Sequence, residues 1–151
     1  MSRQSNEVLL QKTYQALIDG DREGLERLLA PEAEIHIPGR NTVSGDYRGI
    51  DAMLFFFKRL TALTEATYQR ELIDLLIGDN HAAALVHVTG RHGARALDLV
   101  LVFVMAIQSD RVSDLRAYYG DQLAWDSFWS DQMLTGSRAP EFKPPKRPIE
   151  P

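Results

Sequence analysis

Asp121 is the side chain whose neighbours best prepare it for proton transfer. Residues 115–121 read LRAYYGD, a composition typical of a β-strand, along which successive side chains point to opposite faces. Leu115, Ala117, Tyr119 and Asp121 would share one face, which we expect to point inward because its other members are apolar or aromatic. A carboxyl group at the rim of an apolar interior suits general acid or base chemistry. The alternative is that Asp121 reaches solvent where the strand ends, or caps the following helix.

His36 is the second candidate, since an imidazole can move protons near neutral pH. It lies in a short predicted strand, residues 33–37, directly before Pro38. Ile35 and Ile37 occupy the opposite face. If the isoleucines point inward, His36 lies at the surface or rim; an irregular strand end at Pro38 could instead turn it into a pocket.

His87 and Asp98 lie on the predicted strands that follow. His87 is either a pocket residue or a structural histidine with a hydrogen-bond partner. Asp98 shares a face with apolar residues and must reach water, a backbone donor or an arginine; it is either a pocket residue or half of a cross-strand salt bridge. The four histidines lack metal-ligand spacing, so we expect no metal.

Several aromatic side chains could line a cavity for a flat apolar ligand. Phe56 could equally be core, and Trp125 could cover the cavity or enter a dimer interface. The predicted substrate-binding set is Tyr14, Tyr47, Phe56, His87, Asp98, Tyr119 and Trp125, beside the catalytic pair Asp121 and His36.

The pattern along the chain predicts the elements that position these residues. A helix with an apolar face over residues 10–18 ends at Gly20, and Asp21 is a good N-cap for a shorter second helix. After the strand at 33–37, residues 40–49 are rich in turn formers and predict a loop before a third helix. Four strands joined by short turns follow, which makes neighbouring strands antiparallel. We therefore predict an α+β fold in which three N-terminal helices pack on a curved, mostly antiparallel sheet and leave a pocket.

Composition narrows the classes of partner. The 151 residues carry a net charge of −4, which argues against nucleic acid. Without cysteine there is no disulfide or thiolate chemistry. No signal peptide is expected, and the longest apolar run, residues 99–107, is too short to span a membrane. We expect a soluble, cytoplasmic protein with one domain over residues 1–136 and a proline-rich basic tail, extended or disordered, over 137–151.

The order and spacing of several strings resemble the NTF2-like superfamily, and within it the SnoaL-like polyketide cyclases. These strings are HIPG (residues 36–39), SGDYRG (44–49), FFF (55–57), DQ (121–122), WD (125–126) and FW (128–129). The resemblance, over about residues 7–130, implies a cone-shaped α+β fold. It is more distant to ketosteroid isomerase, whose functional residues do not carry over to this sequence.

The resemblance implies two functions of different kinds. In the first, Asp121, which matches the cyclase acid/base aspartate, moves a proton on a small apolar oxygenated substrate with help from His36 and Tyr47 or His87. The reaction would be a cyclisation, isomerisation or hydration/dehydration without a cofactor. In the second, the domain binds a ligand or dimerises without chemistry. A homodimer is expected in both, because large apolar sheet faces of this fold are usually covered by a second copy. A weaker possibility is that the basic tail docks a partner.

Overall fold

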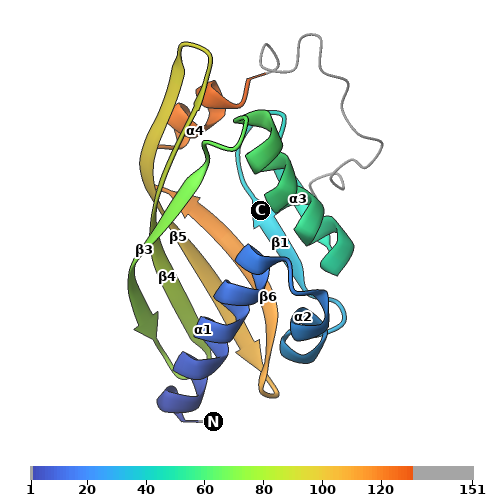
Figure 1. Ribbon diagram of the computed structural model, residues 1–151. Coiled ribbons are helices and arrows are strands. Elements are labelled where there is room, and N and C mark those ends of the chain that lie inside the picture. The colour runs from blue at the N-terminus through green and yellow to red at the C-terminus, as the bar shows by residue number, and fades with distance from the viewer. Residues whose placement is uncertain (1, 131–151) are drawn as a thin grey trace.

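The computed structural model describes residues 2–130, which form four helices and six strands (Figure 1). The predicted tail at 137–151 and the predicted domain end at 136 lie outside the described residues. In chain order the elements are α1 (Arg3–Asp19), α2 (Arg22–Leu28), β1 (Glu34–Ile37), β2 (Gly45–Arg48), α3 (Ile50–Leu63), β3 (Gln69–Ile77), β4 (His81–His92), β5 (Arg95–Gln108), β6 (Arg111–Tyr119) and α4 (Gln122–Phe128).

The first two helices begin and end where local chemistry predicts. Gly20 has a φ of 70° and its N–H bonds to the carbonyl of Ala16, so the left-handed C-cap ends α1. The Asp21 carboxylate then accepts the N–H of Gly24 and starts α2. The predicted stop and cap are confirmed.

The strands form one sheet in the order β2-β1-β6-β5-β4-β3. The four-strand antiparallel meander from β3 to β6 is as predicted, and β1 joins it by pairing parallel to β6. The expected loop at 40–49 was wrong in part, because Gly45–Arg48 pairs with β1 as strand β2. Tertiary pairing with β1 overrides the turn-like composition of this segment.

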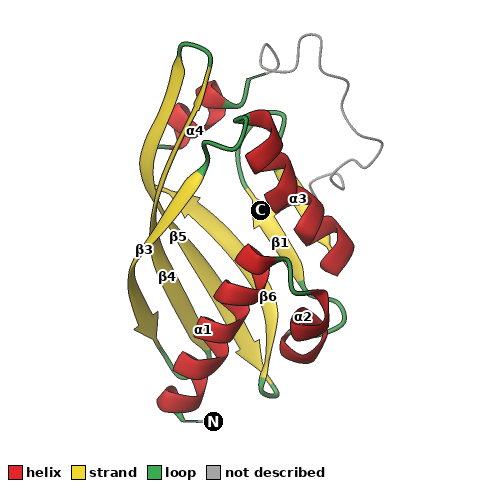
Figure 2. Cartoon of the chain, in the orientation of Figure 1, coloured by secondary structure: helices red, strands yellow, loops and turns green. Residues whose placement is uncertain are grey.

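The helices cover one face of the sheet (Figure 2). α1 packs against β3, β4 and β6, α3 against β2, and α4 against β5 and β6. The predicted count of three helices is not confirmed, because residues 2–130 form four: β1 lies between α2 and α3 as predicted, β2 is additional, and α4 follows β6. The core lies between this inner face and the helices.

The outer face of the sheet has no covering element within residues 2–130. Side chains that alternate away from the core along β4, β5 and β6 form it, among them Leu85, Val102 and Val104. Val100 and Tyr118 are 38% and 53% exposed there. No helix in this part of the chain is long and apolar enough to cross a membrane.

Candidate ligand pocket

An apolar slot lies between the inner face of the sheet and the helices. Its walls enclose about 450 Å³ of non-atom space, the open mouth included. The walls are so close together that the slot as it stands holds roughly one water molecule, and a larger ligand must part them. The lining residues come from α1, α3, the segment before β3, β3 to β6 and α4; they are Tyr14, Leu17, Ile18, Phe56, Phe57, Leu60, Tyr68, Arg70, Val86, Val88, Leu101, Phe103, Met105, Tyr119 and Trp125.

A wider surface groove between α1 and α3 leads to the slot. The two spaces share Leu17, Ile18, Phe57 and Arg70 in their walls. These four residues therefore form the mouth through which the slot meets solvent.

Three tyrosines, Tyr14, Tyr68 and Tyr119, belong to the lining of the slot, whose surface is almost entirely apolar. Burial raises the pKa of Tyr14, Tyr68 and Tyr119, while Arg70 opposes the increase in the pKa of Tyr14 and Tyr68. All three stay protonated near neutral pH and can donate hydrogen bonds. Within residues 2–130 none of these hydroxyls has a hydrogen-bond partner, so each is free for a ligand.

Trp125 adds a further donor. Its ring stacks on Tyr119 with centroids 4.0 Å apart, and its buried indole N–H meets no acceptor in the described part of the chain. Buried polar groups normally have partners, so an acceptor on a ligand is one way to complete this site.

Arg70 is the single charged residue of the described slot lining. Its guanidinium carbon lies 5.2 Å from the ring centroid of Phe57 and 4.9 Å from that of Tyr68. The lining contains no carboxylate and no imidazole among residues 2–130. The site therefore offers hydrogen-bond donors and one cation, and no general base of the expected kind.

The structural argument for Asp121 was wrong. β6 ends at Tyr119, and the N–H of Gly120 bonds to the carbonyl of Val100, so the alternation of faces stops before residue 121. Asp121 is exposed, and its carboxylate accepts the N–H of Ala124 at 3.0 Å as the N-cap of α4. The alternative of a helix cap is confirmed, and Asp121 does not line the slot.

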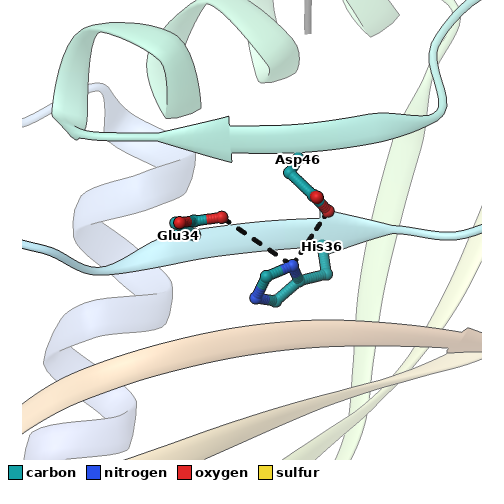
Figure 3. Close-up of side chains that lie close together, drawn as sticks. All are labelled: Glu34, His36 and Asp46. Atoms are coloured by element: carbon teal, nitrogen blue, oxygen red, sulfur yellow. Dashed lines mark hydrogen bonds and ion pairs between the residues drawn. The ribbon is translucent and has the colours of Figure 1, made fainter. Parts of the chain in front are cut away.

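His36 also lies away from the slot, on the outer face of the sheet. Ile35 and Ile37 point into the core, as the surface alternative predicted. The imidazole Nδ1 lies 2.9 Å from Asp46 and Nε2 lies 2.7 Å from Asp114 (Figure 3 draws Asp46). The hydrogen bond to Asp114, and then that to Asp46, raise the pKa of His36 against the effects of burial and Arg116.

Glu34, His36 and Asp46 bring possible metal-ligand atoms within 4.8 Å of one another (Figure 3). Both imidazole nitrogens already bond to carboxylates, and Glu34 pairs with Arg48 at 2.5 Å. The groups therefore satisfy one another as a half-buried ion network on the outer side of the sheet.

The other predicted polar residues also have partners outside the slot. On the outer face, His87 Nε2 lies 2.6 Å from Asp98, so the pair is a cross-strand ion pair. Asp98, and then Glu71, raise the pKa of His87. Tyr47 is fully buried in the core and donates its hydroxyl to the carbonyl of Val43 at 2.6 Å.

The slot thus brings together four predicted residues, Tyr14, Phe56, Tyr119 and Trp125, and excludes the other five. Sequence reasoning missed Tyr68 and Arg70. Their spacing of i and i+2 places both on one face of an extended segment, and an arginine beside an inward aromatic residue was the signal available.

The curved sheet with helices on its inner face has the NTF2-like α+β fold, as in an NTF2-like protein from Burkholderia xenovorans (23% identity, TM-score 0.72, covering 86% of this chain and 99% of its own). The family model for the SnoaL-like domain matches residues 10–133, and the chain belongs to this family.

Three relatives illustrate the similarity. Bal32a, from a soil-derived mobile gene cassette, is 30% identical with a TM-score of 0.74 and covers 83% of this chain and 97% of its own. A "putative SnoaL-like polyketide cyclase" from Jannaschia sp. CCS1 shares the fold at a TM-score of 0.66, with 14% identity over 85% of this chain and 93% of its own. Uncharacterized protein Rv0034 of Mycobacterium tuberculosis is 26% identical over 81% of this chain and 94% of its own length.

Proposed function

We propose that the slot binds a flat, apolar, oxygen-bearing small molecule and polarises its carbonyl group. The observation that carries this proposal is the combination of apolar walls with three phenol groups that lack partners within residues 2–130. Apolar pockets with a few convergent polar groups are typical ligand sites. The aromatic walls favour a planar ligand that can slide between them.

The chemistry that these groups support is stabilisation of an oxyanion. A protonated phenol near a ligand carbonyl would stabilise the enolate that forms when water or hydroxide, entering from the α1/α3 groove, takes the proton of an adjacent C–H, since the described lining holds no carboxylate or imidazole to accept it. Enolisation is the first step of an aldol cyclisation or a double-bond isomerisation, and it needs no cofactor. We therefore propose a cyclase- or isomerase-type reaction, in agreement with the polyketide cyclase description of the Jannaschia neighbour.

A non-catalytic binding module is the second candidate. It is favoured by the absence of a carboxylate and an imidazole from the described slot lining. Such a module would bind the same ligand and leave it unchanged.

The test uses 2-acetonaphthone, a flat neutral ketone. We expect it to quench tryptophan fluorescence through Trp125 and to exchange its acetyl protons faster in D₂O with protein than in buffer, measured by NMR. Tyr14→Phe should keep binding and lower the protein-dependent exchange by roughly tenfold to a hundredfold, because one oxyanion donor is lost.

Val86→Phe supplies the matched control, since Val86 lines the slot and is 1% exposed. The larger ring should fill the slot and abolish binding, at a cost in stability of about 1–3 kcal/mol. Binding without exchange would favour the non-catalytic module. Failure of the ketone to bind, or equal binding by Val86→Phe, would contradict the slot as the ligand site.

We also propose that a second copy of the chain covers the outer face of the sheet. The outer face carries the polar groups of His36 and His87 with their carboxylates, and beside them the exposed apolar side chains of Val100 and Tyr118; exposed apolar side chains rimmed by polar ones are typical of protein–protein interfaces.

A further inference from the structure

We propose that Arg70 binds a carboxylate at the mouth of the slot, so that the ligand is a flat apolar molecule with one acidic group. This inference rests on the proposed function, because the slot must hold the apolar body of the same ligand.

The position of Arg70 is the first argument. It belongs to the walls of both the slot and the α1/α3 groove, and therefore lies where a ligand would pass from water into the protein. A ligand with its ring in the slot would leave its acidic group beside Arg70.

The environment of the guanidinium is the second argument. The rings of Phe57 and Tyr68 fix it by cation–π contacts. No carboxylate pairs with it within residues 2–130, whereas Arg22 pairs with Asp51 and Arg48 with Glu34. Partial burial removes water from the Arg70 guanidinium, and no carboxylate of the described chain offsets this desolvation cost. An anionic group on the ligand would offset it.

The arrangement of the N–H donors of Arg70 favours a carboxylate over a monatomic anion such as chloride. A guanidinium presents parallel N–H groups that match the two oxygens of a carboxylate. Tyr14 lines the same slot as Arg70, and its hydroxyl is a further hydrogen-bond donor for a bound ligand.

The test compares 2-naphthoate with its neutral methyl ester on the full chain, by tryptophan fluorescence and calorimetry. We expect wild type to bind the acid about tenfold or more tightly than the ester, the effect of a charge-assisted hydrogen bond. Arg70→Gln should remove this preference, so that the acid and the ester bind the variant with similar affinity. Arg70→Lys should keep part of the preference for the acid, because lysine retains the positive charge but lacks the paired N–H donors of the guanidinium.

Arg91→Gln is the matched control, since Arg91 is an exposed arginine of β4 that does not line the slot. It should keep the full preference, and added salt should weaken wild-type binding of the acid and not of the ester. Equal affinity for acid and ester, or a preference that survives Arg70→Gln, would overturn the role of Arg70 and leave the apolar slot intact. If neither compound binds, or if Val86→Phe binds both as wild type does, the proposed function fails as well.

Discussion

His36 shows how partners fix the protonation of one side chain. Its imidazole is 17% exposed and lies between Asp46 on β2 and Asp114 on β6, with Glu34 and Arg116 also facing it. The charged imidazole can donate from both nitrogens, which the neutral form cannot. Because the folded-state pKa lies above the unfolded value of 6.5, the resulting stabilisation is present below that pH and is lost as pH rises through the folded-state pKa.

This linkage predicts a pH-dependent effect of His36→Gln. The variant should be less stable than wild type by about 1–3 kcal/mol near pH 6 and by less near pH 9. Denaturant unfolding at both pH values measures the difference. His81→Gln changes an exposed histidine without an ion pair in the described chain, and should show little pH dependence. A His36→Gln effect of the same size at both pH values would contradict the linkage.

The sequence predicted a slot-lining residue correctly only where that residue lies inside a regular helix or strand, since the repeat of the element then determines which way its side chain faces. Tyr14 and Phe56 lie within helices and Tyr119 lies inside β6, so their facing follows from the repeat of the element. Asp121 lies one residue beyond Gly120, where the strand has ended and the repeat no longer applies. His36 and His87 were placed on the correct strands, but their carboxylate partners come from other strands that sequence spacing does not reveal.

At the scale of elements, α4 is a seven-residue helix that closes one side of the slot through Trp125. A helix this short has little stability of its own and depends on its cap and its packing. The Asp121 cap and the stacking of Trp125 on Tyr119 supply these two contributions.

Removal of the cap should therefore affect stability and not chemistry. Asp121→Ala is expected to lower the free energy of unfolding by about 0.5–2 kcal/mol, whereas Asp121→Asn should retain most of it, because asparagine also caps helices. Denaturant unfolding measures the change, and ketone proton exchange should be unaffected by Asp121→Asn. Loss of exchange in a folded Asp121→Asn would restore the acid/base role predicted from the sequence.

The elements themselves were largely readable from sequence. Helix caps and turn residues are local signals, so Gly20 and Asp21 were placed correctly. β2 was missed because its four residues become a strand only through pairing with β1, for example His36 with Asp46. The parallel pairing of β1 with β6 joins residues far apart in the sequence, so no local sequence pattern predicts it.

For the whole molecule, the open sheet face predicts a homodimer. Wild type should sediment as a dimer at micromolar concentration, and Val100→Lys or Tyr118→Lys should shift it to monomer, because a charge would be buried at the interface. Leu123→Lys, at an exposed leucine of α4, is the control that should leave the dimer intact. A wild-type monomer would contradict the expected assembly.

The pairing of Ile35 in β1 with Leu115 in β6 has a consequence for how the chain folds. The meander from β3 to β6 connects close neighbours and can form early, whereas the β1–β2 hairpin can dock only after a loop of about 80 residues closes. During synthesis β1 leaves the ribosome well before β6, so the N-terminal third of the protein lacks its partner strand until β6 has been made. Late docking of this hairpin is expected to complete the native structure and to limit its rate of formation.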